Sequence, residues 1–170
     1  MNFKKLNNDS TCCIKPNGNK FWYNKKGVYH RLDGPAAEYA DGYKAWYLNG
    51  KLHRENGPAA EHDRSQSWWY HGKLHRIDGP AVLHEDGTKE WWVNDKPHRL
   101  NAPAIEFADG TKKWYIDGIC HREDGPAVQY PDGNKEWWIH NIRYATEKHY
   151  WLKIYEMGLI TKIDLFLKLL

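Results

Sequence analysis

Apolar and polar residues alternate in short stretches along the chain, and the pattern returns every 22 or 23 residues. In the first complete period the alternating stretches are Ala36–Ala40 and Lys44–Leu48. Asp41-Gly42 separates these stretches and Asn49-Gly50 follows them. Such dipeptides favour tight turns because both residues accept φ above zero. The pattern predicts a mainly β fold: an elongated antiparallel meander of about five hairpin repeats with about two strands in each repeat.

Three landmarks recur at this spacing. The aromatic pairs begin at Trp22, Trp46, Trp68, Trp91, Trp114 and Trp137. The His-Arg pairs begin at His30, His53, His75, His98 and His121. After each His-Arg pair comes one residue and then Asx-Gly-Pro-Ala, except in the fourth copy, which reads Asn101-Ala102-Pro103-Ala104. The second copy is one residue short and has Asp63-Arg64-Ser65-Gln66 in place of the Asp-Gly turn. Landmarks at a fixed period identify a tandem repeat whose copies are single supersecondary units.

Alternation along each strand also predicts which side chains share a face of the sheet. In the first strand Ala37 falls with Tyr39, and in the second strand Trp46 falls with Leu48. We expect these two sets to form the packed face. The opposite face then holds Glu38 and the second residue of each aromatic pair. We expect those aromatics to form a ladder, made of Tyr23, Tyr47, Trp69, Trp92, Tyr115 and Trp138.

The two ends differ from the repeats at 20–144. Residues 1–19 carry no repeat landmark and are interpreted as an arm or a degenerate repeat. In residues 145–170, Thr146 is placed to cap a helix that runs to about Met157, with Gly158 just beyond it. A second helix is expected after Thr161, with an apolar stripe at helical spacing: Ile163, Phe166, Leu167 and Leu170. This helical segment either caps the sheet, as repeat arrays require, or serves as a dimerisation or docking helix.

Charge and composition narrow the function classes. Residues 1–19 and 141–170 each carry a net charge of +2, so the stretch 20–140 carries −1. A repeat region without a basic stripe argues against duplex nucleic acid as the partner. The three cysteines are too few for a disulfide framework and favour a reducing compartment. No apolar run is long enough to cross a bilayer and residues 1–20 have no secretory pattern, so we expect a cytoplasmic protein.

The repeat resembles a known family. A period of 23 residues, with Asn-Gly-Lys-x-His and an Asp-Gly turn between aromatic-rich strands, is similar to MORN repeats. The variant Trp-Tyr-x-Asn-Gly-x-x-His-Arg-x-Asp-Gly-Pro-Ala resembles repeat proteins of tailed phages and giant viruses. The resemblance spans about Lys20 to Tyr144. It implies stacked β-hairpins that serve as an interaction platform without catalysis, in the host cytoplasm if the source is viral.

The His-Arg pairs allow two interpretations. A residue that recurs in every copy solves a problem that every copy has, such as holding the Asx-Gly-Pro bend through a bond from Arg31 to Asp33 or to backbone carbonyls. Alternatively, the guanidinium forks and the imidazoles bind a phosphate-bearing nucleotide, whose base stacks on an aromatic ring. Functional asymmetry is expected where copies deviate, at Arg64–Ser67, His71, Pro97 and Ala102.

Catalytic and metal sites are not expected. The His-Arg histidines lie one per repeat, roughly 10 Å apart by strand spacing, so they cannot share one ion. None of the three serines lies in a nucleophile motif, and no glycine-rich phosphate loop is present. An open sheet of repeats offers a face or a groove rather than an enclosed pocket. We therefore expect no enzyme activity, no cofactor and no metal.

Three functions remain as hypotheses. The first is a non-enzymatic protein, of viral origin, that docks on a host protein and blocks it. The second is a sponge that sequesters a phosphate-bearing nucleotide signal, and the third is binding to an anionic membrane surface. The helical segment allows a homo-oligomer as well. The candidate binding residues are Tyr47, Trp69, Trp92, Tyr115, Trp138, Arg54, Arg76, Arg99, His75 and His98.

Overall fold

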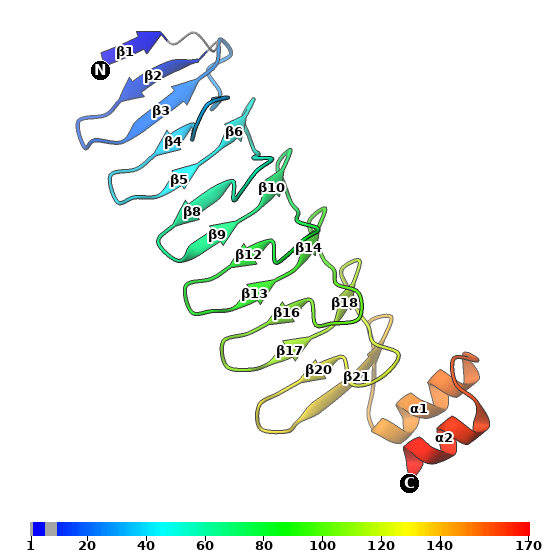
Figure 1. Ribbon diagram of the computed structural model, residues 1–170. Coiled ribbons are helices and arrows are strands. Elements are labelled where there is room, and N and C mark those ends of the chain that lie inside the picture. Colours follow the sequence, from blue (N-terminus) through cyan, green and yellow to red (C-terminus); the bar gives the residue numbers. More distant parts are fainter. Residues whose placement is uncertain (1, 6–9) are drawn as a thin grey trace. The chain divides into compact units, whose positions relative to one another are not determined.

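The computed structural model describes the backbone of residues 2–5 and all of residues 10–170. The chain divides into two compact units, Met1–Lys96 and Pro97–Leu170. Both units are built from repeated short antiparallel β-hairpins, and the second ends in two helices (Figure 1). The predicted fold class, mainly β with hairpin repeats and a helical end, is confirmed. Residues 1 and 6–9 of the predicted N-terminal arm lie outside the described residues.

In the first unit, neighbouring strands of the main sheet follow chain order and are all antiparallel. These strands are β1 (Asn2–Lys5), β2 (Thr11–Ile14), β3 (Lys20–Tyr23), β4 (Ala37–Glu38), β5 (Lys44–Ala45), β8 (Ala60–His62), β9 (Ser65–Ser67), β12 (Val82–Leu83) and β13 (Lys89–Glu90). Separate small hairpins are formed by β6 (Tyr47–Leu48) with β7 (Lys51–Leu52), and by β10 (Trp69–Tyr70) with β11 (Lys73–Leu74). The unit also contains β14 (Trp92–Val93), and β15 (Lys96–Pro97) spans the division between the units.

The second unit repeats this plan and adds the helices. Its main sheet contains β16 (Ile105–Glu106), β17 (Lys112–Lys113), β20 (Val128–Gln129), β21 (Lys135–Ile139) and β22 (Ile142–Tyr144). The small hairpin is β18 (Tyr115–Ile116) with β19 (Ile119–Cys120). The helices are α1 (Glu147–Glu156) and α2 (Lys162–Leu169). No helix among the described residues is both long and apolar enough to cross a bilayer.

Turn chemistry explains why each copy forms its main hairpin. Gly87 has φ of 93°, a conformation open to glycine, and its backbone N–H donates to the His84 carbonyl at 3.0 Å. The Asp86 carboxylate accepts the backbone N–H of Thr88 at 2.8 Å, an Asx bond that fixes the turn. In the shortened second copy, Asp63 itself takes a positive φ of 47°. The turn is therefore kept although the Asp-Gly dipeptide is missing.

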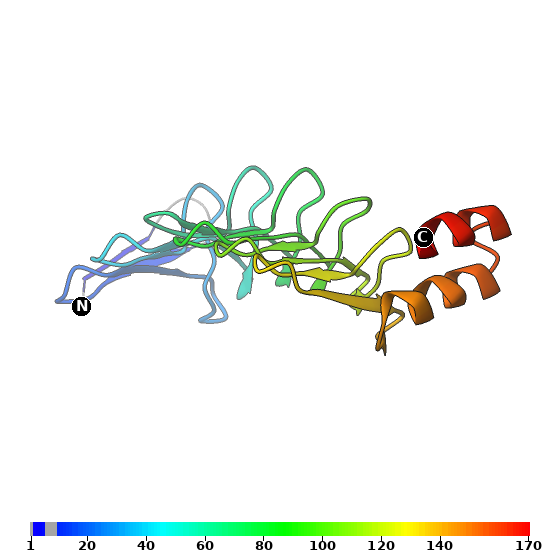
Figure 2. The ribbon, with the colours of Figure 1, turned by 90° about the horizontal axis from the view of Figure 1, so that it is seen from below.

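The predicted second strand is interrupted. Its residues 44–48 form two pieces, β5 and β6, because the chain leaves the main sheet at Trp46. The backbone N–H of Trp46 still donates to the Ala59 carbonyl, but its own carbonyl accepts from His53. Each complete copy therefore contains a main hairpin and a small hairpin, which is more than the two strands predicted. A loop that rises from one face of the sheet then returns the chain to the next main strand (Figure 2).

The predicted assignment of faces is wrong. Ala37 lies opposite Ala45, so Ala37 shares its face with Ala45 and with Tyr47, which packs on the same cluster. Glu38 lies on the other face, where its carboxylate accepts a hydrogen bond from Arg31, which stacks on Trp22. The second aromatics thus lie with the alanines, and the first aromatics lie with the glutamates. Register explains the error, since shifting a strand pair by one residue exchanges its faces.

Small side chains fill the centre of the repeats. The alanine after each proline is 0% exposed in all five copies: Ala36, Ala59, Ala81, Ala104 and Ala127. Large side chains are fully buried beside α1, where Tyr150 and Ile154 pack with Trp137 of β21. The side chain of Thr146 accepts the backbone N–H of His149 and begins α1, as predicted. Helix α1 therefore covers β21 and contributes the bulkiest part of this unit's core.

Candidate functional site

Between each small hairpin and the next main strand lies a loop that contains the arginine, Asx and proline that recur in every copy. These loops are called the Asx-Gly-Pro loops: residues 31–35, 54–58, 76–80, 99–103 and 122–126. In the first loop, Arg31 Nε donates to Asp33 at 2.8 Å. Its Nη1 donates to the Pro35 carbonyl at 3.2 Å and to Glu38 at 3.2 Å. The predicted bond from Arg31 to Asp33 is therefore confirmed, and the guanidinium holds its own loop.

The guanidiniums of Arg31, Arg54, Arg76 and Arg122 also cover the first ring of an aromatic pair. The Arg76 Cζ lies 4.0 Å from the Trp68 ring centroid, and three further copies have distances between 3.9 and 4.2 Å. On its other side, Arg76 lies against Gly79, where a Cβ atom would come within 2.9 Å of Cζ. The arginine is thus enclosed between an indole and a glycine. This close approach explains why glycine follows Asx in four of the five copies.

The fourth loop, which contains Asn101, differs from the loops that contain Asp. The Asp78 carboxylate accepts from Arg76 Nε at 2.9 Å, and this hydrogen bond lowers the pKa of Asp78. Asp124 pairs with Arg122 in the same way. Where Asn101 replaces Asp, its backbone takes a positive φ of 58°, and the following residue is Ala102 rather than glycine. The fourth loop thus accommodates a Cβ atom by changing its backbone conformation.

The histidine before each arginine has a role that sequence reasoning did not identify. His75 Nδ1 accepts the backbone N–H of Asn94, which lies in the following small turn with a φ of 52°. The same bond joins His30 to Asn49, His53 to His71, His98 to Asp117, and His121 to His140, with N···N distances of 3.1 to 3.3 Å. A ring nitrogen that accepts a hydrogen bond carries no proton, so this bond requires the tautomer whose proton lies on Nε2. His98 Nδ1 also lies 3.0 Å from the Asp117 carboxylate, a contact that requires the proton on Nδ1 instead. The histidines therefore act as caps of neighbouring turns.

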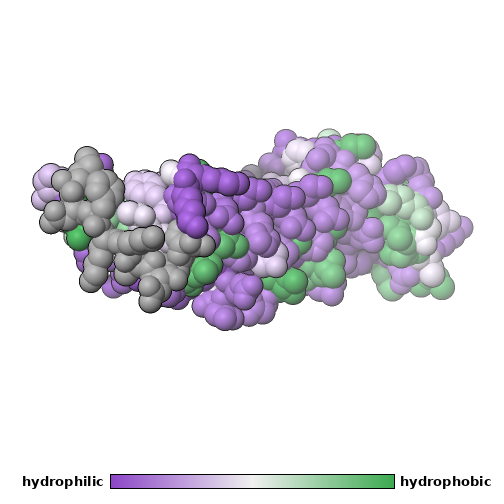
Figure 3. All heavy atoms as spheres, turned by 90° about the horizontal axis from the view of Figure 1, so that it is seen from above, coloured by the Kyte–Doolittle hydropathy of each residue, from purple (hydrophilic) through white to green (hydrophobic). Residues whose placement is uncertain are grey.

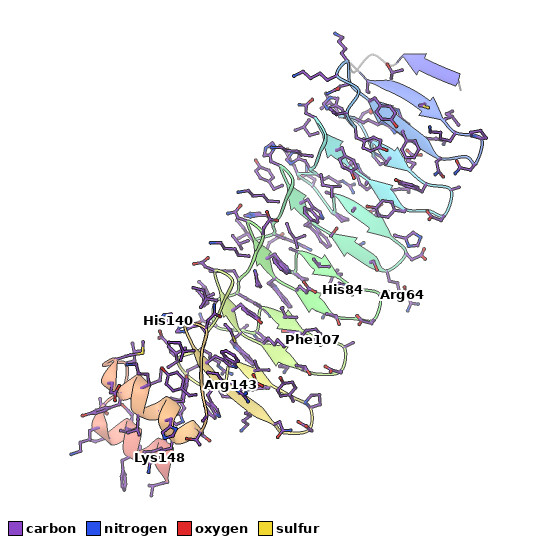
Figure 4. All side chains as sticks on the ribbon, turned by 180° about the vertical axis from the view of Figure 1, so that it is seen from behind. Arg64, His84, Phe107, His140, Arg143 and Lys148 are labelled. Atoms are coloured by element: carbon purple, nitrogen blue, oxygen red, sulfur yellow. The ribbon has the colours of Figure 1, made fainter. Side chains whose placement is uncertain are left out.

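Two of these histidines also stack on another imidazole. The ring centroids of His53 and His71 are 4.3 Å apart, and those of His121 and His140 are 4.5 Å apart (Figure 4 labels His140). Burial, together with the neighbouring His71, lowers the pKa of His53. The sequence shows the spacing of 18 or 19 residues between each histidine and its turn. It does not show that the backbone N–H of that turn needs an acceptor from another part of the chain.

Grooves separate consecutive Asx-Gly-Pro loops. In the first unit, a groove of about 720 Å³ lies between residues 31–35 and 53–56, and one of about 590 Å³ lies between residues 54–57 and 75–78. In the second unit, a groove of about 420 Å³ lies between residues 99–101 and 121–124. Each groove is bounded by arginine, histidine, tryptophan and acidic side chains. They are shallow clefts rather than closed cavities.

The residue between Arg and Asx lies at the exposed part of each loop. Leu32, Ile77 and Leu100 occupy this position in three copies and are 68%, 85% and 66% exposed. Glu55 and Glu123 occupy it in the other two copies. Because two copies form the loop with glutamate, the repeat itself does not require an aliphatic side chain there. Sequence reasoning missed these residues, although their position between two landmark residues could have identified them.

The predicted aromatic anchors are half-buried. Indole N–H groups of the ladder donate to side chains two residues earlier: Trp69 to Ser67, Trp92 to Glu90 and Trp138 to Glu136, at 2.7 to 2.9 Å. Burial raises the pKa values of Tyr47 and Tyr115. These rings are therefore held in place by their own strands, with one part packed and one part open.

The predicted site residues are not all brought together. Arg54, Arg76, His75 and Trp69 line the grooves of the first unit, and Arg99 lines the groove of the second. The other five predicted residues do not line these three grooves: Tyr47, Trp92, Tyr115, Trp138 and His98. No group of three potential metal ligands occurs among the described residues. Comparisons with protein-family models and with curated proteins give no match.

Proposed function

We propose that the chain is a MORN-like repeat protein without catalytic activity that binds another protein, and that in a viral setting the partner is a host protein that it blocks. The contact surface within each unit is its set of Asx-Gly-Pro loops together with the grooves between them. Repeats of this kind provide a series of similar loops at a fixed spacing, which suits an extended contact with a macromolecule.

The exposed aliphatic residues carry this proposal. Ile77 is 85% exposed, beside a groove that also contains Trp68 and Trp69. Isolated exposed apolar residues are common on protein surfaces, but here the equivalent position in other copies is glutamate. The aliphatic side chains at this position are therefore not required for the repeat fold, and we assign them to binding. An apolar side chain next to tryptophan and arginine has the composition of a protein-binding hot spot.

The loops are also held in place before any partner binds. Arg76 bonds to the middle of its loop at Asp78 and to the end of the loop at the Pro80 carbonyl, and it stacks on Trp68. A loop fixed in this way loses little conformational entropy on binding. Ile77 is thus presented from a rigid base, which favours recognition of a folded or helical protein surface.

A phosphate-bearing ligand is less well supported. The arginine donors that would bind phosphate already bond to carbonyls and carboxylates of their own loops. Asp78 is 85% exposed as a side chain at the same groove, and an anion would be repelled by its negative charge. The groove is therefore better suited to a partner with apolar and basic groups.

The test compares the wild-type chain with Ile77→Glu, which copies the glutamate of the second repeat and leaves the loop intact. Both proteins are used to capture partners from host extract, followed by quantitative mass spectrometry and a binding assay on the enriched protein. We expect Ile77→Glu to reduce the affinity at least tenfold, while Glu55→Gln, a change at the equivalent position of a neighbouring loop, has a smaller effect. Equal affinities for wild type and Ile77→Glu would contradict the proposal. Native mass spectrometry of the purified chain covers the alternative, because an added mass of a few hundred daltons that is lost on denaturation would favour the nucleotide sponge.

A further inference from the structure

The shortened second copy of the repeat contains a hollow in the main sheet. The hollow has a volume of about 180 Å³ and lies in the first unit, on the face that carries the alanines and the second aromatics. The side chains of this face that line it are Tyr43, Ala60, His62, Ser65, Ser67, Val82 and His84. The arginines of the Asx-Gly-Pro loops stack on the other face, so the hollow is separate from the grooves between those loops.

Two serines open the hollow. The other copies have alanine or a long charged side chain at the position of Ser67: Ala45, Glu90, Lys113 and Glu136. At the position of Ser65 they have larger side chains: Tyr43, Thr88, Thr111 and Asn134. The second copy alone has serine at both positions. Its floor is accordingly less covered, because Ser67 is half-buried whereas Ala45 in the first copy is 0% exposed.

The first copy shows which group fits such a place. Tyr43 lies between Tyr39 and His62 of the neighbouring strands, with ring centroids 5.4 and 6.4 Å away. Ser65 has the same position one copy later. It lies opposite His62 on one side, and the register of β9 with β12 places it beside His84 on the other (Figure 4 labels His84). The hollow is therefore the place of a ring that the second copy does not supply.

Size and polarity indicate the kind of ring. The volume of about 180 Å³ is close to the roughly 150 Å³ of an engineered cavity that binds benzene. The oxygen of Ser67 accepts the indole N–H of Trp69 at 2.8 Å, so the proton of the Ser67 hydroxyl remains available to donate. His62 Nε2 donates to the Asp41 carbonyl at 3.1 Å, which leaves Nδ1 of the neutral imidazole as an acceptor. A ring that carries a hydroxyl group, which both donates and accepts, matches this lining.

We propose that this hollow binds a hydroxyphenyl ring, supplied by a free phenol or by a tyrosine of another molecule. The ring enters between His62 and His84, as Tyr43 lies between its own neighbours in the first copy. Among the described residues, none that lines the hollow is lysine or arginine, so a phosphate-bearing ring has no cation to pair with here. Over the repeats, Figure 3 shows hydrophobic side chains in separate patches among hydrophilic ones, which fits contact through a single ring better than through a broad apolar surface.

Nuclear magnetic resonance on the full, isotope-labelled chain tests the site. The probe is p-cresol, added from roughly 0.1 to 10 mM around an expected Kd in the millimolar range. We expect saturable shifts of the backbone N–H signals of Ser65 and Ser67, and of the Trp69 indole N–H that bonds to Ser67. Toluene, which lacks the hydroxyl group, should bind about fivefold more weakly because it leaves the polar lining without a partner.

Three variants separate the hollow from the rest of the face. Ser65→Tyr supplies the chain's own ring, as Tyr43 does in the first copy, and should reduce the affinity for p-cresol at least about tenfold. Ser67→Glu copies Glu90 of the third copy, including its bond from an indole N–H, and should have the same effect. Asn134→Tyr introduces the same ring at the equivalent, exposed position of the fifth copy and should leave the affinity unchanged. Thermal unfolding of each variant verifies that the fold is retained.

A tripeptide, acetyl-Gly-Tyr-Gly-amide, distinguishes the two sources of the ring. Tighter binding of the tripeptide than of p-cresol would assign the hollow to a tyrosine of a partner protein, and weaker or equal binding would assign it to a free phenol. Four results would overturn the proposal: no saturable shift with either probe at about 10 mM, shifts that map elsewhere on the chain, equal binding of toluene and p-cresol, or wild-type affinity of Ser65→Tyr. Ile77→Glu should bind p-cresol like the wild type, so the hollow and the loop surface are tested separately.

Discussion

Replacing Gly79 by alanine tests whether the arginine in each loop is a structural element. Gly79 does not have a positive φ, so alanine is compatible with the backbone at this position. The obstacle is the Arg76 Cζ atom, which would lie 2.9 Å from the new methyl group. Ordinary van der Waals contact needs a longer distance, and therefore the guanidinium must move away from its loop.

The expected loss follows from the contacts that Arg76 makes. The hydrogen bond to the Pro80 carbonyl contributes about 1 kcal/mol. The stack on Trp68 contributes about 0.5 to 1 kcal/mol, whereas solvent screens the ion pair with the exposed Asp78, which therefore adds little. Alanine restricts the unfolded chain and returns about 0.5 kcal/mol of stability. We therefore expect Gly79→Ala to lower the free energy of unfolding by about 1 to 1.5 kcal/mol.

The fourth copy of the repeat supplies a matched rescue. Its loop has Asn101 and Ala102, and Asn101 takes a positive φ that asparagine tolerates. The double variant Asp78→Asn with Gly79→Ala imports this pair and should recover about half of the loss. Urea unfolding followed by tryptophan fluorescence measures all three proteins. A Gly79→Ala protein as stable as wild type would refute the structural role of the guanidinium, and a double variant no better than the single one would refute the alternative loop.

Three further predictions concern other parts of the repeats. The pKa of His53 is lowered, so on acidification the unfolded chain takes up a proton at this residue before the folded chain does, and stability should fall as pH decreases below about 6.5. In His53→Asn the side-chain oxygen keeps the acceptor without titrating, so the urea midpoint should depend less on pH between 7.5 and 5.5. An unchanged pH dependence of the midpoint would contradict this. Ala81→Val adds two methyl groups at a position that is 0% exposed and should cost about 1 to 3 kcal/mol, whereas the same change at an exposed alanine should cost little. Tyr150→Phe removes the hydroxyl that donates to the Arg122 carbonyl and accepts from the Gly125 N–H, and should lower the free energy of unfolding by about 1 to 2 kcal/mol; a melting temperature equal to wild type would show that this bond is not stabilising.

The hairpins, the loop arginine and the helix caps could be predicted because they depend on residues close in sequence. Asp86-Gly87 defines its own turn, Arg31 bonds to a residue two positions away, and Thr146 caps the helix that follows it. The faces of the sheet could not be predicted with the same ease. They depend on whether Ala37 lies opposite Ala45 or its neighbour, and alternation alone leaves that register open.

The candidate site was predicted in part for a similar reason. Repetition indicated that arginine and histidine are important, but it gave no partner for the histidine, whose acceptor bond reaches a turn 18 or 19 residues away. The repeat pattern also does not single out the residue between Arg and Asx, because this position varies from copy to copy. Ile77 and Glu55 occupy the same place, and their difference becomes informative when the exposed fraction of Ile77 is known.

The histidine bonds give the repeat array a direction. Each histidine accepts from the turn of the copy that follows it, so a copy stabilises a left-handed turn that lies outside its own 23 residues. For His121 the acceptor bond goes to His140 in the β21–β22 hairpin, which takes the place of a further copy. A duplication of 23 residues within the array would therefore leave every such bond satisfied, whereas loss of the final hairpin would leave an imidazole without its donor. Copies can therefore be gained or lost inside the array during evolution without breaking these bonds, whereas the histidine of the last copy requires the terminal hairpin.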